Sequence, residues 1–302
     1  MGGKINAKDL RSIAIAGLTI GIILVLIKGQ RLPDDNFIPN LSPKTVHYRF
    51  LIRNTTNRPV ADAYFFVHAP LKQTSTQQCD HIDASHPFER VTDRLGNQLL
   101  KFTFDTFPPY ASKIVSVRAN LMRAPTPMGL GGCDAARFAG PAKDAHADDI
   151  ALRHLASRLT SGTAHATAAN LYAWVVDHIA YTGYSREAKG ARSALSNRQG
   201  DCTEFADLFV ALARAVDIPA RRVSGYLAHE NSVLRPADYH DWAEFFENGV
   251  WRIADAQQRN FDARYPDYIA MRIYDHLPPT SPIGDFQLFY VRGKGLKAKM
   301  DS

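Results

Sequence analysis

The apolar positions of residues 45–123 follow a period of two. Every second residue is apolar over 46–52, 100–104 and 115–119, and most residues between them are polar or charged. This alternation is typical of strands that bury one face. Turn-forming residues separate the apolar segments, for example at 54–57 and 108–109. The pattern therefore predicts a small antiparallel β-sandwich.

Beyond residue 148 the spacing of apolar residues changes to that of an α-helix. Apolar residues recur at intervals of three and four over 150–159 and 171–179, which predicts two amphipathic helices. A third helix is predicted over 205–216 and ends before Pro219, which cannot continue it. Residues 124–147 are rich in Gly, Pro and Ala and predict a linker between the sandwich and this helical region.

Apolar segments on both sides of Asn248-Gly249 predict a β-hairpin, because Asn-Gly is a strong signal for a two-residue turn. The predicted register pairs Phe246 with Trp251, Glu244 with Ile253, Trp242 with Asp255, and His240 with Gln257. His240 and Asp255 then become diagonal neighbours on one face, with Cα atoms about 7–8 Å apart. Asp241 points to the opposite face. The hairpin therefore favours Asp255 as the partner of His240.

The N-terminal region carries an uncharged apolar stretch over residues 12–27. As a helix it would span about 24 Å, and flanking Lys and Arg side chains can extend that reach. No A-x-A-like cleavage site follows, so an uncleaved signal anchor is favoured over a cleaved signal peptide. The excess of Lys and Arg before the stretch places the N-terminus inside and the remaining chain across the membrane.

Composition excludes several classes of protein. Of 302 residues, 45% are hydrophobic and 22% are charged, which is typical of globular chains and not of disordered or fibrous ones. Three cysteines without CxxC spacing exclude a zinc ribbon, and Val233 occupies the second ligand position of an HExxH motif that begins at His229. The net charge of +6 is scattered, so no nucleic-acid partner is indicated.

Cys202 lies directly before the predicted helix 205–216. Free N–H groups and the positive end of the helix dipole would favour a thiolate there, and the same N–H groups could hold an oxyanion. Most free cysteines are instead small buried apolar residues, and position alone does not separate these interpretations. His240 and Asp255 supply the base and the orienting carboxylate that a nucleophilic cysteine needs. A metal cluster of His229, His240 and Asp241 is a competing interpretation.

The motifs GDCTEFADLFVALARAVDIPARRVSGY and HDWAEFFENGVWRIAD carry a resemblance to the transglutaminase-like superfamily, as a bacterial membrane-anchored member. The resemblance implies an α+β, papain-like core, with Cys202 as nucleophile, His240 as base and Asp255 as the orienting carboxylate. Trp242 and Glu244 match the family's H-x-W-x-E strand, where Glu244 is structural rather than a general acid. The front sandwich is loosely similar to accessory domains of some members. The resemblance implies no metal or organic cofactor.

The expected function is thiol-dependent acyl transfer on an amide bond of a peptide or protein substrate. Arginines between Cys202 and His240 suggest a basic surround, which would repel a protonated lysine and attract acidic peptides. Hydrolysis is therefore expected rather than cross-linking to an amine. The alternatives are a protein-glutamine transamidase, a non-catalytic tethered scaffold, and a sandwich that recruits a membrane partner. Candidates for a second oxyanion donor are Tyr184, Asn197 and Gln199.

The expected organisation places the catalytic domain outside the cytoplasmic membrane, on a single N-terminal span. The predicted segments are a membrane anchor (12–28), a stalk (29–44), the sandwich (45–123), a linker (124–147), the catalytic domain (148–292) and a flexible basic tail (293–302). In an oxidising compartment, Cys79 and Cys133 are left as a candidate disulfide pair, since Cys202 must stay free.

Overall fold

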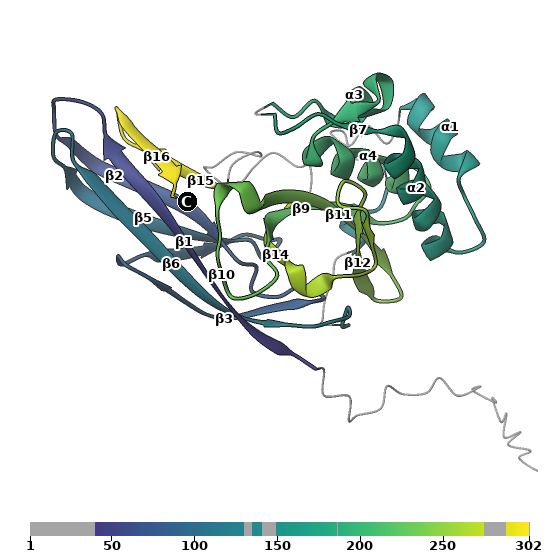
Figure 1. The fold of residues 1–302 in the computed structure, drawn as a ribbon, viewed down its shortest axis with the longest axis horizontal. Coiled ribbons are helices and arrows are strands. Elements are labelled where there is room, and N and C mark those ends of the chain that lie inside the picture. The colour runs from purple at the N-terminus through teal and green to yellow at the C-terminus, as the bar shows by residue number, and fades with distance from the viewer. Residues whose placement is uncertain (1–39, 130–134, 141–148, 186, 275–287, 302) are drawn as a thin grey trace, which may run out of the picture. The chain divides into compact units, whose positions relative to one another are not determined.

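The computed structural model describes residues 40–129, 135–140, 149–185, 187–274 and 288–301. In these ranges the chain is a mixed α+β protein (Figure 1). No helix in them is long and apolar enough to cross a membrane. The predicted anchor (12–28) and most of the predicted stalk (29–44) lie outside the described residues, so both stay predictions.

Six strands build the predicted sandwich: β1 (Ser42–Asn54), β2 (Val60–Ala69), β3 (Gln77–Ala84), β4 (Glu89–Thr92), β5 (Gln98–Phe107) and β6 (Ser112–Arg123). β1, β6 and β3 are neighbours in one sheet, and β2, β5 and β4 are neighbours in the other. The alternating apolar residues face inward, and Val46, Tyr48, Phe50 and Ile52 are fully buried. The prediction of a small antiparallel sandwich is therefore confirmed.

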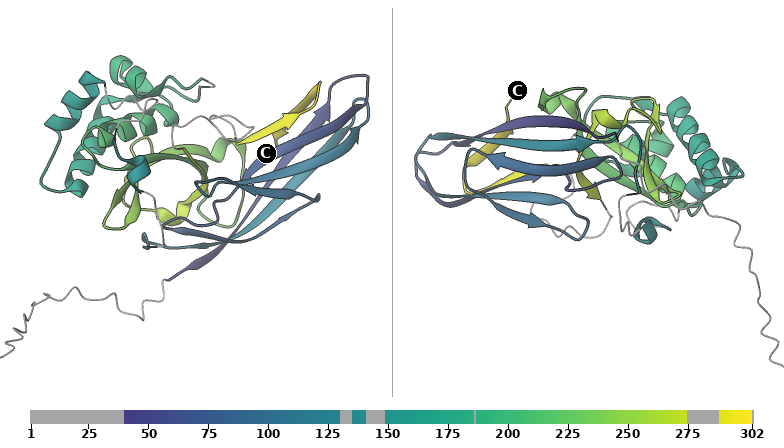
Figure 2. Two further views of the ribbon diagram at one scale, coloured as in Figure 1. Left: turned by 180° about the vertical axis from the view of Figure 1, so that it is seen from behind. Right: turned by 90° about the horizontal axis from the view of Figure 1, so that it is seen from below.

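Later segments of the chain complete both sheets. β15 (Phe289–Arg292) pairs with β2, and β16 (Leu296–Met300) pairs with β1. Figure 2 shows these yellow C-terminal strands among the purple and blue strands of the sandwich. A short strand, β10 (Ser232–Val233), also lies along β1, parallel to it.

The prediction that residues 293–302 form a flexible basic tail is therefore wrong, and the sandwich takes up strands from both sides of position 292. Leu296, Ala298 and Met300 alternate with lysines, and this period of two matches a strand. Leu296 and Met300 are buried in the sandwich core, whereas Lys297 and Lys299 point outward from it. Part of the predicted linker is also ordered: η1 (Ala135–Phe138) buries Phe138 against Trp251, with ring centroids 5.3 Å apart.

Four helices form a layer on one face of a second sheet: α1 (Ile150–Arg158), α2 (Ala164–His178), α3 (Gly190–Asn197) and α4 (Cys202–Arg214). Every residue of α4 is buried, because the other helices and the sheet surround it. A short parallel pair, β7 (Ala180–Tyr181) and β8 (Gln199–Gly200), leads into α4. The three helices predicted from periodicity are confirmed, and α3 was not predicted.

The second sheet has the order β13-β12-β11-β9-β14. Its strands are β9 (Ala220–Leu227), β11 (Tyr239–Glu247), β12 (Val250–Asp255), β13 (Asn260–Phe261) and β14 (Tyr268–Tyr274). Ala243, Phe245 and Ala254 face the helices, whereas Trp242, Trp251 and Ile253 face a separate apolar cluster that includes Leu71 of the sandwich. The sheet is thus covered on both faces.

The hairpin β11–β12 has the predicted register. Phe246 pairs with Trp251 and Glu244 with Ile253. Asn248 and Gly249 have φ values of 51° and 82°, the left-handed conformation that a two-residue turn of this type requires. The hydrogen-bonded pairing of β11 with β12 ends at Ala243–Ala254. The predicted pairs Trp242–Asp255 and His240–Gln257 therefore lie beyond it.

Candidate active site

Cys202 is the first residue of α4, and a capping box holds it there. The carboxylate of Asp201 accepts the N–H of Thr203 at 2.8 Å, and that of Glu204 accepts the N–H of Asp201 at 3.0 Å. At the first helical position, the N–H of Cys202 has no acceptor within the helix. The placement inferred from the sequence, a cysteine at a helix start, is therefore confirmed.

Burial opposes the predicted effect of this position on the thiol. Burial raises the pKa of Cys202 well above its ordinary value, and the negative charge of Asp241 raises it further. A hydrogen bond with the backbone of Asp241 opposes this only in part. Cys202 is only 7% exposed, so the thiolate would lose most of its hydration there. Burial therefore favours the neutral thiol.

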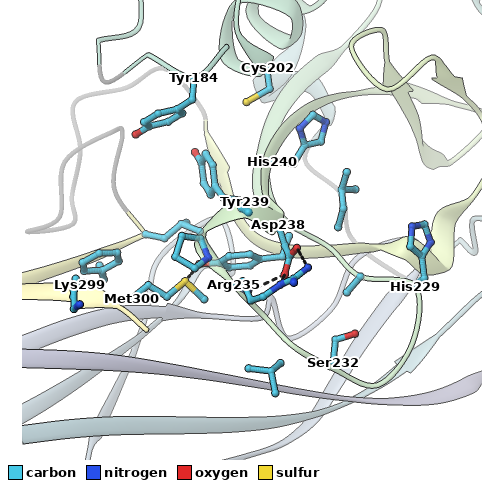
Figure 3. A pocket seen from close by; sticks show the side chains of 18 of the residues that line it. Tyr184, Cys202, His229, Ser232, Arg235, Asp238, Tyr239, His240, Lys299 and Met300 are labelled. Atoms are coloured by element: carbon cyan, nitrogen blue, oxygen red, sulfur yellow. Dashed lines mark hydrogen bonds and ion pairs between the residues drawn. The ribbon is translucent and has the colours of Figure 1, made fainter. Parts of the chain in front are cut away.

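His240 and Asp255 form a buried pair. Nε2 of His240 lies 2.6 Å from Oδ2 of Asp255, and the two residues are 4% and 2% exposed. His240 lies near the start of β11 and Asp255 at the end of β12, as the hairpin register predicts. Because Nε2 is bound to the carboxylate, Nδ1 is the nitrogen left to accept a proton from the thiol. Cys202 and His240 line one pocket, where Figure 3 draws them as neighbours.

Asp241 belongs to a different network. Its Oδ2 accepts the hydroxyl of Thr203 at 2.7 Å. Its Oδ1 accepts the hydroxyls of Tyr239, at 2.9 Å, and Ser224. These bonds join the start of α4 to β9 and β11 on the helix side of the sheet. The structure thus keeps Asp241 apart from the imidazole that Asp255 holds.

Trp242 and Glu244 surround the pair without joining it. The indole ring of Trp242 stacks on His240, with centroids 6.4 Å apart. The carboxylate of Glu244 is bound by Arg221 at 2.7 Å, and both side chains are buried. A carboxylate fixed in this way is structural, which agrees with the interpretation of Glu244 drawn from the resemblance.

Sequence reasoning missed Tyr268, whose hydroxyl donates to Oδ2 of Asp255 at 2.9 Å. It also missed the N–H of Gln258, which lies 3.1 Å from Oδ1 of the same carboxylate. Tyr268 begins β14, and no motif in the sequence connects it with Asp255. Only the arrangement of the sheet brings the two side chains together.

The pocket has a volume of about 1840 Å³ and extends from Cys202 to β15 and β16. Tyr181 and Tyr184 line it near Cys202 and are 53% and 69% exposed. Of the candidate oxyanion donors, Tyr184 lines the pocket, whereas the amide of Asn197 donates to Ser193 at 3.0 Å. Gln199 is not among the residues that line it. The sequence did not single out Tyr181.

The expected basic surround is wrong. Each of the four arginines between Cys202 and His240 has a partner. Arg214 donates to the carbonyl of Ala220, Arg221 binds Glu244, Arg222 binds Asp207, and Arg235 binds Asp238. Arg214, Arg221 and Arg222 are buried. Of the four, Arg235 alone lines the pocket, and Asp238 compensates its charge. Charge around the pocket therefore gives no preference for an acidic substrate.

The metal interpretation finds no support in the described ranges, where no group of three His, Cys, Asp or Glu side chains is placed to hold an ion. His229 lies 3.1 Å from Asp267, apart from the His240–Asp255 pair. Cys79 is buried in β3 and forms no disulfide within the described residues. Cys133 lies outside the described residues, so the proposed disulfide stays a prediction.

Comparison with known proteins gives the following similarities. A candidate cysteine protease from Cytophaga hutchinsonii has a similar structure, with a TM-score of 0.62 and 18% sequence identity over 87% of this chain and 89% of its own. The periplasmic domain of TgpA from Pseudomonas aeruginosa is 17% identical over 70% of this chain and 87% of its own, with a TM-score of 0.39. No curated protein matches the sequence.

The sequence profile of the transglutaminase-like superfamily matches residues 153–256. This range contains α2, α3, α4 and the hairpin, and with them Cys202, His240 and Asp255. The match and the arrangement of these elements agree, and residues 153–256 form a transglutaminase-like domain.

Proposed function

We propose that this chain is a thiol-dependent acyl-transfer enzyme that acts on an amide bond of a peptide or protein. Cys202 is the nucleophile, His240 the base and Asp255 the carboxylate that orients it. The buried 2.6 Å contact between His240 and Asp255, beside a cysteine at a helix start, carries the proposal. The transglutaminase-like profile over the same residues supports it.

The chemistry follows from the neutral state of the thiol. As the sulfur of Cys202 attacks the amide carbonyl carbon, Nδ1 of His240 takes the thiol proton. The carbonyl π electrons move to oxygen, and the free N–H of Cys202 can bind that oxyanion. Asp255 stabilises the imidazolium and holds its tautomer. When the tetrahedral intermediate collapses, the C–N bond breaks and the leaving amine takes the proton from His240.

The acyl-enzyme is then resolved by water, giving a free acid, or by an amine, giving a new amide. We favour water, because neither of the two carboxylates that line the pocket is placed to guide a lysine amine to the acyl-enzyme. Asp238 is bonded to Arg235, and Glu230 lies in an exposed loop. Neither forms an enclosed acidic channel for a lysine amine. A glutamine peptide with a labelled primary amine tests the choice. Release of free acid should exceed covalent incorporation of the label, and the reverse would make the chain a transamidase.

Replacing His240 with alanine should slow alkylation of Cys202 by iodoacetamide at pH 7 by about 10²-fold, the lower end of general-base effects. The raised thiol pKa leaves little thiolate at neutral pH, so the reaction needs a base. In the variant, the rate should instead rise about tenfold per pH unit with the thiolate fraction. Peptide mapping of the Cys202 peptide measures both rates.

The matched control is His229→Ala. His229 lines the same pocket but is exposed and lies beside Asp267. Its removal should leave the alkylation rate unchanged. Equal rates for the wild type and His240→Ala would show that His240 does not activate Cys202, and the proposed function would then be abandoned.

We further propose that residues 12–28 anchor the chain in the cytoplasmic membrane, with the transglutaminase-like domain on the outer side. The uncharged run and the lysines and arginine before it support this topology. A reporter joined after Ser302 through a flexible linker should be active only outside the cytoplasm. Deletion of residues 1–27 should release a soluble protein. A reporter active inside the cytoplasm would reverse the proposed orientation.

A further inference from the structure

The carboxylate of Asp255 is held by three donors. Oδ2 receives both His240, at 2.6 Å, and the hydroxyl of Tyr268, at 2.9 Å, whereas Oδ1 receives the N–H of Gln258 at 3.1 Å. The amide of Asn260 donates to the Tyr268 hydroxyl at 3.1 Å, which directs the hydroxyl proton toward Asp255. Bonds to both oxygens prevent the carboxylate from rotating and keep Oδ2 aimed at the imidazole.

Tyr268 belongs to a strand that needs outside support. β14 is the last strand of its sheet, and Tyr268 lies beyond the residues that match the superfamily profile. Its neighbour β9 carries Gly225, where a Cβ would come within 1.9 Å of the carbonyl oxygen of Ile269. This glycine permits the close approach of β14 to β9. On its other edge, β14 has no strand as partner in the described sheet.

Buried polar side chains of the sandwich cover that other edge. Arg123 of β6 donates to the carbonyls of Tyr265, at 2.5 Å, and Tyr268. Lys44 of β1 donates to the carbonyl of Pro266 at 2.9 Å. Further bonds run from Gln77 to both backbone groups of Ala270 and from Asn97 to both backbone groups of Ile273, at 2.7–3.0 Å. Four sandwich side chains, together with the N–H of Leu71, which donates to the carbonyl of Ala270 at 2.8 Å, thus take the place of a neighbouring strand.

These four side chains do more than fill space between the sandwich and β14. Lys44, Gln77, Asn97 and Arg123 are 0–6% exposed. Burial lowers the pKa of Lys44 to about 8 and that of Arg123 to about 9, which reports how unfavourable a charge is at each position. Apolar side chains would fill the same space without that cost. What the charged and amide groups add is a defined position for the backbone of residues 265–273.

We propose that Tyr268 is a positioning residue for the His240–Asp255 pair, and that the sandwich, chiefly through Arg123, fixes the position of Tyr268. The proposal rests on the proposed function of Cys202, His240 and Asp255. It makes the sandwich part of the catalytic unit rather than an appended domain, because three bonded groups connect β6 to the imidazole: Arg123, Tyr268 and Asp255.

Tyr268→Phe tests the first half, because it removes one hydroxyl and keeps the ring that packs on Trp242 at 5.1 Å. Without that donor, more negative charge remains on Oδ2 and the imidazolium becomes more stable. The His240-dependent limb of the pH profile of Cys202 alkylation should therefore move to higher pH by about half a unit. The maximal rate should fall about threefold to tenfold, because Oδ2 of Asp255 loses one of the two donors that hold it in position.

The matched control is Tyr265→Phe, three residues earlier in the same buried segment. The hydroxyl of Tyr265 donates to Asp262 instead of Asp255. Both variants lose one buried hydroxyl, and thermal unfolding will show the stability that each loses. Only Tyr268→Phe should move the pH profile. A profile of Tyr268→Phe that coincides with the wild type, or equal shifts in the two variants, would overturn the positioning role.

Arg123→Lys tests the second half. It retains the charge but loses the forked guanidinium that reaches two carbonyls. The profile should move in the same direction as in Tyr268→Phe, and the double variant should shift no further than Tyr268→Phe alone. Arg118→Lys, an exposed position on the same strand, is the control. Shifts that add in the double variant would show that Arg123 does not act through Tyr268.

Lys44→Met is a second variant, to be used if Arg123→Lys does not fold. It removes the bonds to the carbonyls of Pro266 and Ala228 and should shift the profile in the same direction by a smaller amount. An unchanged profile in a folded Lys44→Met would overturn the role of the sandwich. Failure of the proposed function has a different signature, since alkylation of the wild type would then not depend on His240 at all.

Discussion

Replacement of Cys202 by alanine is expected to abolish amide turnover and leave the fold intact. The sulfur forms the acyl-enzyme, and removal of such a nucleophile costs on the order of 10⁶-fold in kcat in enzymes of this logic. The change deletes one atom from a side chain at the helix start, where the capping box of Asp201 and Glu204 remains. Turnover of amide peptides, together with thermal unfolding, measures both effects.

The control for this prediction is Cys79→Ala. Cys79 is the other free cysteine in the described part of the chain, and it is buried in β3 of the sandwich. Its replacement should retain turnover. Substantial activity in a folded Cys202→Ala would remove the acyl-enzyme from the mechanism, whereas activity lost equally in both variants would indicate a general loss of structure.

Asp255→Asn should lower the rate about 10²- to 10⁴-fold with little change of fold, since a triad carboxylate sets both tautomer and counter-charge. An amide in place of Oδ2 presents N–H groups to Nε2 or leaves the imidazole without its negative partner. The effect should appear in kcat, because Asp255 is 2% exposed and lies behind His240. Steady-state kinetics on an amide peptide separate kcat from KM.

Asp241→Asn is the matched comparison. It makes the same change from carboxylate to amide at a buried residue that is next to His240 in the sequence. Asp241 binds hydroxyls that can rotate to accept from an amide, so the fold should tolerate the change. Its negative charge helps to raise the pKa of Cys202, and its removal should lower that pKa. Alkylation of Cys202 should then begin at lower pH, with turnover largely retained. Equal losses of turnover in the two asparagine variants would contradict the assignment of Asp255.

The parts of the molecule that depend on local sequence could be predicted. Helix periodicity located α1, α2 and α4, and Pro219 indicated where α4 ends. Asn248-Gly249 fixes a two-residue turn, and a turn of known length sets the register of both strands. That register places Asp255, and not Asp241, on the same face of the hairpin as His240.

Properties that depend on distant segments could not be predicted in this way. β15 pairs with β2 and β16 with β1, strands that lie more than 200 residues earlier in the chain. The lysines in β16 made this segment look like a charged tail. The arginines after Cys202 looked like a basic surface, but their buried carboxylate partners lie on other elements.

The sequence by itself determined the cysteine at a helix start and the histidine and aspartate on one face of a hairpin. Each of these follows from bonds between residues close along the chain. The tertiary structure decided the burial that raises the pKa of the thiol, the support of Asp255 by Tyr268, and the support of β14 by the sandwich. These depend on burial and on contacts between segments far apart in sequence, because solvent exclusion and hydrogen-bond partners arise only when the whole chain packs.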